Sequence, residues 1–320
     1  MPCYRPITGY RGPVNPSTGR RPLVFNRREA WAPARAIDRD VSVTIPCGRC
    51  IGCRLERSRQ WAMRCVHEAS LYEQNCFITL TYNEESLPKN RSLVKKHFQD
   101  FIRSLRDQLR YLNELHDLKR GFCEYPQKDA RIRYFHCGEY GEENGRPHYH
   151  AILFNFDFPD KILLSERETG NLYESKLLTE TWGKGHCSIG SVTFDSAAYV
   201  ARYVVKKITG PEAEAHYQGR LPEYTTMSRR PGIGKGWLDK FESDAYPSDE
   251  VAIRGRLMRP PKYYDRQLEV ANPDFFRLVK LRRRSDALMG RDDEEFGVTR
   301  LRVKEKCQEL ALKQQLKRKL

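Results

Sequence analysis

Hydrophobic residues recur with two different periods along the middle of this chain. Residues 76–82, 131–137 and 147–154 are rich in β-branched and aromatic side chains, which predicts three strands. Over 93–112 the apolar residues fall three or four positions apart, which predicts an amphipathic helix that packs on the sheet. Residues 138–145 contain Gly and Asn and predict a loop that joins the second and third strands as an antiparallel hairpin.

The pattern beyond the hairpin predicts further short elements. Residues 175–182 suit a short helix, and residues 186–194 alternate like a strand. Asp195 and Ser196 have side chains that cap the start of a helix, and Gly210 suits its end. Mostly antiparallel strands with helices on one face predict an α+β fold, a central antiparallel sheet flanked by helices.

The two ends of the chain differ in pattern from this core. Residues 1–46 carry Pro, Gly and Arg with little periodicity and predict an extended arm that ends in a short strand. A basic helix is expected over 55–71, and the charged C-terminal region is predicted to be helical. We therefore expect a Cys-rich arm with the basic helix (1–72), a core (73–210) and a basic C-terminal region (211–320).

The charge of the chain indicates a polyanionic partner. The formal net charge is +15, and residues 251–320 hold 19 Lys and Arg against 10 Asp and Glu. This excess favours nucleic acid, and the C-terminal region is expected to contact phosphates. The alternative is a solvated helix that is basic only for solubility. No apolar run approaches the ~20 residues of a membrane span, so no membrane partner is expected, and we predict a cytoplasmic location.

Two histidines in the third predicted strand are candidate metal ligands. His148 and His150 stand two residues apart, so both side chains point to one face of the strand, with Phe156 expected further along that face. The hairpin brings Glu139 beside them, and Glu143, deeper in the loop, is the competing carboxylate. Two imidazoles and a carboxylate suit Mg²⁺ or Mn²⁺, and Zn²⁺ is also chemically possible. Ordinary strand histidines are the alternative.

Two tyrosines in the last predicted helix of the core are candidate nucleophiles. Tyr199 and Tyr203 are four residues apart and therefore lie on one helix face. Lys206 and Lys207 follow one turn later, where their charges would stabilise a phenolate. In isolation the pair is also typical of core or stacking tyrosines. Beside a metal, however, a tyrosine could attack a nucleic-acid phosphodiester and remain attached through a phosphotyrosine.

Several segments, taken in order, resemble one known family. FITLTY, CGEYG with GRPHYHAILF, and AAYVARYVVKK look like the three motifs of HUH endonucleases of the rolling-circle initiator type. With MPCY, PCGRCIGCR, MSRRPGIGKGW and MRPPKYYDR, they are together similar to the replication initiators of microviruses, especially the gokushovirus branch. The resemblance runs from the N-terminus to Arg266.

The resemblance implies a fold, a reaction and a set of residue roles. The sheet would carry the HUH strand centrally, with the tyrosine helix facing it. The protein would nick viral origin DNA, keep the 5′ end as a phosphotyrosine, leave a 3′-OH for a host polymerase and later circularise the displaced strand in the bacterial cytoplasm. A host helicase is also expected as a partner. Tyr199, Tyr203 and Lys206 would be catalytic, His148, His150 and Glu139 would bind metal, and Arg202, Lys207, Arg229 and Arg230 would bind DNA.

Four cysteines form a separate candidate site. Cys47, Cys50 and Cys53 lie in a CxxCxxC pattern, and Cys3 joins them if the N-terminal arm folds back. Structural zinc would pin that arm. Buried free thiols, or an iron–sulfur or redox site, are the alternatives.

Two other kinds of protein fit parts of this sequence. A non-catalytic single-stranded nucleic-acid binding protein would stack aromatic rings on bases and would not nick DNA. A metal-dependent nuclease that uses an activated water would cut without forming a covalent adduct.

Overall fold

A computed structural model describes residues 3–19, 21–31, 42–119, 131–141, 144–166, 170–206, 211–289 and 297–317. They form two compact units, residues 58–283 and residues 1–57 with 284–320. The boundaries expected from the sequence, at 72 and 210, stay predictions.

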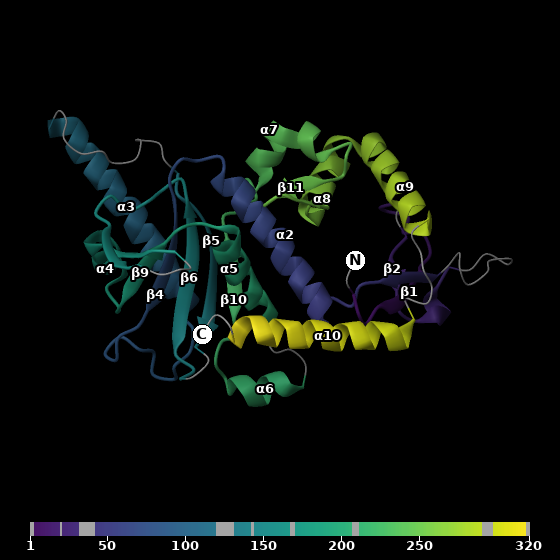
Figure 1. Cartoon of the computed structure of the whole chain (residues 1–320), viewed down its shortest axis with the longest axis horizontal. Coiled ribbons are helices and arrows are strands. Elements are labelled where there is room, and N and C mark those ends of the chain that lie inside the picture. The colour runs from purple at the N-terminus through teal and green to yellow at the C-terminus, as the bar shows by residue number, and fades with distance from the viewer. Residues whose placement is uncertain are drawn as a thin grey trace. The chain divides into compact units, whose positions relative to one another are not determined.

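A seven-stranded antiparallel sheet forms the centre of the larger unit, in the order β10-β5-β6-β4-β9-β8-β7 (Figure 1). The strands are β4 (Asn75–Thr81), β5 (Arg133–Tyr140), β6 (Pro147–Phe154), β7 (Ile162–Ser165), β8 (Leu172–Glu174), β9 (Cys187–Gly190) and β10 (Tyr224–Met227). β6 carries the histidine pair and lies between β4 and β5. The predicted α+β class with a central antiparallel sheet is confirmed.

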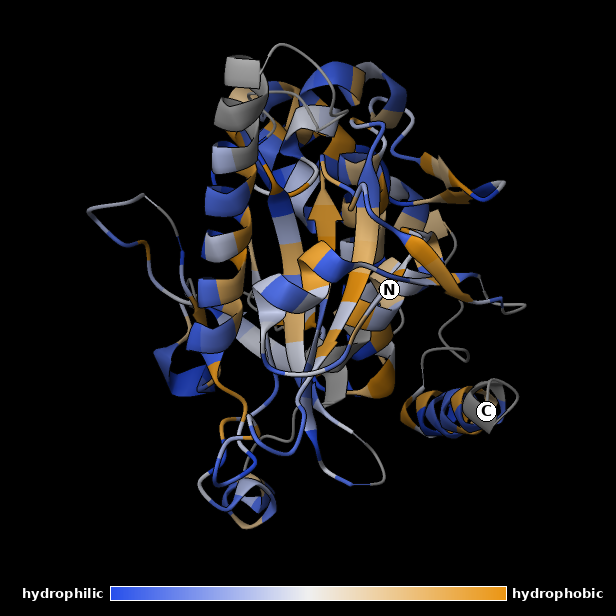
Figure 2. Cartoon of the chain, turned by 90° about the vertical axis from the view of Figure 1, so that its left-hand side faces the viewer, coloured by the Kyte–Doolittle hydropathy of each residue, from blue (hydrophilic) through white to orange (hydrophobic). Residues whose placement is uncertain are grey.

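Helices cover both faces of this sheet. They are α2 (Ile51–Ala69), α3 (Lys95–Lys119), α4 (Lys176–Trp182) and α5 (Phe194–Lys206). α3 and α4 bury Phe98 and Trp182 against one face, whereas α5 buries Val200 against the other, together with Cys65 of α2. The prediction of helices on one face was wrong, because β6 is buried along both faces. Figure 2 shows hydrophobic residues gathered on the strands of the sheet.

The two strands of the β5–β6 hairpin pair over more residues than predicted. Pairing continues to Tyr140 opposite Pro147, beyond residue 138 where the loop was expected to begin. Gly138 lies within the strand, and Tyr149 and Tyr224 pack where a side chain would lie, within 3.2 Å of a Cβ. Glu139 consequently lies within β5, directly opposite His148.

Phe156 does not lie on the histidine face, where strand alternation placed it. β6 ends at Phe154, and Asn155 has a left-handed backbone with φ of 61°. This conformation interrupts the alternation. Phe156 therefore packs in the core on the opposite side of the sheet, with Phe158.

Thr193, and not Asp195 or Ser196, caps the start of α5. The amide of Ser196 donates to the Thr193 hydroxyl at 3.1 Å, and the amide of Thr193 donates to the Ser196 hydroxyl at 2.8 Å. This reciprocal pair is a capping box, which starts the helix one turn ahead of Ser196. Asp195 falls inside the first turn, and Gly210 lies outside the described residues.

The rest of the larger unit forms a helical layer with its own core. Its elements are α6 (Glu212–Tyr217), α7 (Lys235–Ala245), β11 (Val251–Ile253), β12 (Arg256–Met258), α8 (Lys262–Ala271) and α9 (Pro273–Met289). Leu238, Tyr264, Leu268 and Phe276 are buried together there. The predicted helical character of the C-terminal region is confirmed.

The smaller unit contains a three-stranded sheet and one long helix. β1 (Ile7–Arg11) lies between β2 (Leu23–Val24) and β3 (Ser42–Ile45), where the sequence suggested an arm with a single short strand. The helix is α10 (Val298–Lys317). None of the helices in the described ranges is both long enough and apolar enough to cross a bilayer.

Candidate metal centre

Glu139, His148 and His150 converge on one face of the sheet. The Oε1 atom of Glu139 lies 2.7 Å from Nε2 of His148 and 2.7 Å from Nε2 of His150. Ligand atoms at neighbouring positions of an octahedral ion are ~3 Å apart when each lies ~2.1 Å from the ion. The three side chains thus present two nitrogens and an oxygen, all within 4.8 Å of one another, as a group that could hold a single cation.

His148 has the orientation of a metal-bound histidine. Its Nδ1 lies 3.1 Å from the carbonyl oxygen of Arg146, which can only accept, so Nδ1 is the donor of this hydrogen bond. The other ring nitrogen, Nε2, faces the Glu139 carboxylate at 2.7 Å. A ring nitrogen that donates to a carbonyl while the other faces the ion is the usual arrangement of histidine ligands.

Glu139 is held as a buried carboxylate. Its exposed fraction is 2%. Burial raises the pKa of this carboxyl, but the contacts with His148 and His150 lower it by more, so the net pKa lies below its ordinary value. The second oxygen, Oε2, is buried and has no hydrogen-bond partner among the described residues. A buried carboxylate with an unsatisfied oxygen needs a compensating charge, which a cation would provide.

The neighbouring strand β4 fixes the ring of His150. Thr79 of β4 lies opposite His150, and its hydroxyl is 2.9 Å from Nδ1 of that ring. Phe77, two residues earlier, stacks against the same ring with centroids 5.6 Å apart. The sequence pattern did not single out either residue. The strand pattern of FITLTY could have indicated both residues, because strand alternation puts Phe77 and Thr79 on one face.

Tyr199 of α5 lies over the metal-ligand face. Its ring meets the His150 ring edge-on, with centroids 5.1 Å apart, and it also contacts Phe77. Its exposed fraction of 37% leaves the tyrosine accessible. The structure therefore brings one of the two predicted nucleophiles together with the predicted ligands.

The other predicted residues of this helix are described less fully. Tyr203, Arg202 and Lys206 fall within the bounds of α5, but their side chains lie outside what the structure describes. Lys207 lies outside the described residues, as does Glu143, the competing carboxylate. Their predicted roles stay predictions.

Arg229 and Arg230 lie away from the ligand trio. Both are exposed in the turn that follows β10. β10 pairs Met227 with Phe135, so this turn lies toward the opposite end of β5 from Glu139. Any contact of these arginines with DNA would involve nucleotides distant from the metal centre.

The four cysteines predicted as a group do come together in the smaller unit. The sulfur atoms of Cys3, Cys47, Cys50 and Cys53 all lie within 4.8 Å of one another. All four are free thiols, and only Cys50 is buried.

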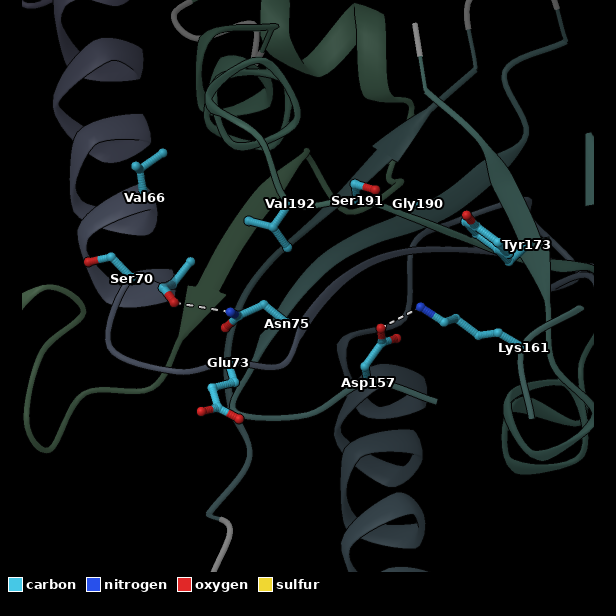
Figure 3. A pocket seen from close by; sticks show the side chains of 11 residues that line it. Val66, Ser70, Glu73, Asn75, Asp157, Lys161, Tyr173, Gly190, Ser191 and Val192 are labelled. Atoms are coloured by element: carbon cyan, nitrogen blue, oxygen red, sulfur yellow. Dashed lines mark hydrogen bonds and ion pairs between the residues drawn. The ribbon is translucent and has the colours of Figure 1, made fainter. Parts of the chain in front are cut away.

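A separate cavity of about 450 Å³ opens at the far end of β4, beside Asn75 (Figure 3). Lys161 lines this cavity and forms an ion pair with Asp157. Its Nζ also lies over the ring of Tyr173, 5.0 Å from the ring centroid. Asn75 is opposite Phe154 in the sheet, six residues along β6 from His148. The cavity is therefore distinct from the metal centre.

Comparison with known proteins finds relatives among phage proteins. The family described as replication-associated protein ORF2/G2P matches residues 75–208. Replication-associated protein VP4 of Bdellovibrio phage phiMH2K is 34% identical over 236 residues, covering 73% of this chain and 70% of that protein. Replication-associated protein ORF2 of Spiroplasma virus 4 is 33% identical over 261 residues, covering 78% and 76%. Replication-associated protein ORF4 of Chlamydia phage 1 is 29% identical over 229 residues, covering 70% and 53%. No solved structure matches at the same level of significance.

Proposed function

This chain belongs to the family of phage replication-associated proteins, and from this premise we propose that it is the endonuclease that nicks one strand of circular viral DNA at the replication origin. The observation that carries the proposal is the position of Tyr199, which contacts the ring of a candidate metal ligand, His150. A nucleophile and a set of cation ligands are thus combined on one face of the sheet, where a phosphodiester could reach both.

Glu139, His148 and His150 would hold the divalent ion, which we propose to be Mg²⁺ or Mn²⁺. When bound, the ion would act as a Lewis acid on the non-bridging oxygens of the phosphodiester. Thr79 and the Arg146 carbonyl orient the two imidazoles, so that both Nε2 atoms face the same point. Because only three side chains would bind the ion, its remaining coordination positions would be open to substrate oxygens.

The chain's own chemistry is a transesterification. A phenol oxygen of Tyr199 or Tyr203 attacks phosphorus after its proton passes to solvent, and the bond from phosphorus to the 3′ oxygen breaks. The released oxygen takes up a proton, which leaves a free 3′-OH and a 5′-phosphotyrosine. Because the phosphotyrosine keeps the energy of the phosphodiester, a later attack by a 3′-OH can rejoin the displaced strand. Two tyrosines permit two such steps in succession.

The 3′-OH also determines the proposed partners. It is a primer for a host polymerase, and a host helicase would open the duplex ahead of it in the bacterial cytoplasm. Lys206 would neutralise the phosphotyrosine, while Arg202, Lys207, Arg229 and Arg230 would hold the DNA backbone.

The nucleophile is tested with supercoiled DNA that carries the viral origin, incubated with the protein and Mn²⁺. We expect nicked circles with protein attached to a 5′ end. Exchanging both Tyr199 and Tyr203 for Phe should abolish the nick and the adduct, whereas Tyr111→Phe, at an exposed tyrosine of α3, should change neither. Nicking without an adduct would indicate an activated water as the nucleophile. Binding without nicking, across several divalent metals, would indicate a non-catalytic binding protein.

The ligands are tested by removing them one at a time. His148→Ala and His150→Ala should each abolish nicking and leave salt-sensitive DNA binding largely intact, because neither imidazole is needed to attract phosphates. His216→Ala, at an exposed histidine of α6, is the matched control and should nick normally. Retained nicking in the His148 or His150 variant would contradict the assignment.

A further inference from the structure

We propose that Cys3, Cys47, Cys50 and Cys53 bind one structural Zn²⁺ that fixes the N-terminal segment and, through it, helix α10. The site is independent of the strand-transfer chemistry, and its occupancy can be measured without DNA. Its ligands come from three places in the chain: Cys3 near the N-terminus, Cys47 and Cys50 in the turn after β3, and Cys53 in the first turn of α2.

The distances between sulfur atoms suit a single tetrahedral ion. The Sγ atoms of Cys3 and Cys50 are 3.9 Å apart, and all four sulfurs lie within 4.8 Å of one another. With Zn–S bonds of ~2.3 Å, ligand sulfurs of a tetrahedral site are ~3.8 Å apart. An iron–sulfur cluster binds its thiolates to different iron atoms, so its ligand sulfurs must be spread more widely. The observed spacing therefore favours one ion over a cluster.

Backbone amides point at the sulfurs as they do around bound thiolates. Cys3 Sγ accepts from the amide of Cys47 at 3.3 Å, and Cys50 Sγ accepts from the amide of Tyr4 at 3.4 Å. Cys47 Sγ accepts from the amides of Arg49 and Cys50, at 3.4 and 3.3 Å. N–H donors favour the charged thiolate over the neutral thiol, and the thiolate is the form that binds metal.

The turn between Cys47 and Cys50 depends on Gly48. Its φ of 73° lies in the left-handed region, where a residue without a Cβ is unstrained. This conformation lets the chain reverse within three residues, so that two sulfurs and their amide donors face one point. Buried free thiols are the weaker interpretation, because only Cys50 of the four is buried.

The proposed ion would join segments that are distant in sequence. Cys3 lies 44 residues from its amide donor at Cys47. Two residues after Cys3, the guanidinium of Arg5 donates to Glu305 of α10 at 2.7 Å, and the Glu305 side chain is 7% exposed. A clamp on Cys3 would therefore place Arg5 for its ion pair with α10, within the same unit of the structure.

The experiment measures metal content in the full-length chain, purified without chelator. A variant with His148→Ala and His150→Ala empties the other site, so that the remaining metal reports on the cysteines alone. We expect one zinc per chain in this variant. Adding Cys3→Ser or Cys53→Ser should reduce the zinc to less than a fifth of that value, whereas Cys307→Ser, at the exposed cysteine of α10, should leave it unchanged.

A second measurement does not depend on whether those variants fold. Replacing the zinc by Co²⁺ in the chain with all its cysteines should produce the intense visible bands of a tetrahedral tetrathiolate site. Removing the metal should then speed proteolytic cleavage within residues 3–31 and within α10, and re-adding zinc should reverse it. Iron with acid-labile sulfide, full zinc retention in the Cys3 and Cys53 variants, or cobalt spectra without thiolate bands would each overturn the proposal.

Discussion

Thr79 is not itself a candidate metal ligand, but it contacts one, His150. Its hydroxyl is the hydrogen-bond partner of the Nδ1 atom of His150, at 2.9 Å. This contact fixes the ring angle that directs Nε2 toward Glu139. Partners of this kind orient metal ligands and raise their basicity. We therefore expect Thr79 to be a positioning residue, which acts through His150.

Thr79→Val should weaken binding of Mn²⁺ by roughly 10–100-fold, because the valine keeps the shape of the side chain and removes only the hydroxyl. Thr81→Val is the matched control: Thr81 lies two residues further along β4, and its hydroxyl donates to the carbonyl of His186. Titration calorimetry or Mn²⁺ electron paramagnetic resonance gives both affinities. Excess Mn²⁺ should restore nicking by the Thr79 variant, and equal affinities of the two variants would rule out the positioning role.

At the scale of elements, the strands and helices that the sequence predicted are those with strong local patterns. β4, α3 and the β5–β6 hairpin each repeat apolar residues at a clear period. The hairpin alone was enough to bring Glu139 to the histidines. β7, β8 and β10 were not predicted, because they are only three or four residues long and are defined by their neighbours in the sheet. β10, in particular, precedes a connector rich in Pro and Gly.

The errors within predicted elements have a common physical cause. Asn155 takes a left-handed conformation that many residues avoid, and Thr193 caps α5 where the sequence pattern favoured Asp195 or Ser196. In both places the local sequence permits more than one conformation. His148 and His150 escaped this ambiguity because two-residue spacing on a strand leaves only one relative orientation.

The connection into β9 provides a test at this scale. Gly185 has a φ of 147°, and a Cβ there would lie 2.3 Å from the amide nitrogen of Asn83. This approach lets residues 184 and 186 accept backbone hydrogen bonds from the end of β4. Gly185→Ala should lower the free energy of unfolding by about 1–3 kcal/mol or more, since it adds both strain and a clash with backbone.

Gly190→Ala is the control for that substitution. Gly190 lies in the same segment, in β9, and the nearest atom to an added Cβ is 3.7 Å away, an ordinary contact. Its stability should change by less than about 1 kcal/mol. Denaturant titrations followed by circular dichroism compare the two variants. Equal stabilities would mean that the close approach at Gly185 is not needed to hold β9 against β4.

For the molecule as a whole, the distribution of charge matters more than the total of +15. α10 carries Arg302, Lys306 and Lys313 at exposed positions spaced by four and seven residues, so the three cations follow one stripe of the helix. If this stripe contacts phosphates, exchanging all three for Gln should reduce the salt dependence of single-stranded DNA binding. The slope of log K against log salt should fall by about 2, at ~0.7 per phosphate contact.

The matched control removes the same charge from α3, at Lys96, Arg103 and Arg110, each 70% or more exposed. Because α3 covers the sheet face opposite the metal centre, that variant should keep its slope. Equal slopes in the two triple variants, measured by fluorescence anisotropy between low and physiological salt, would mean that α10 attracts DNA only through net charge.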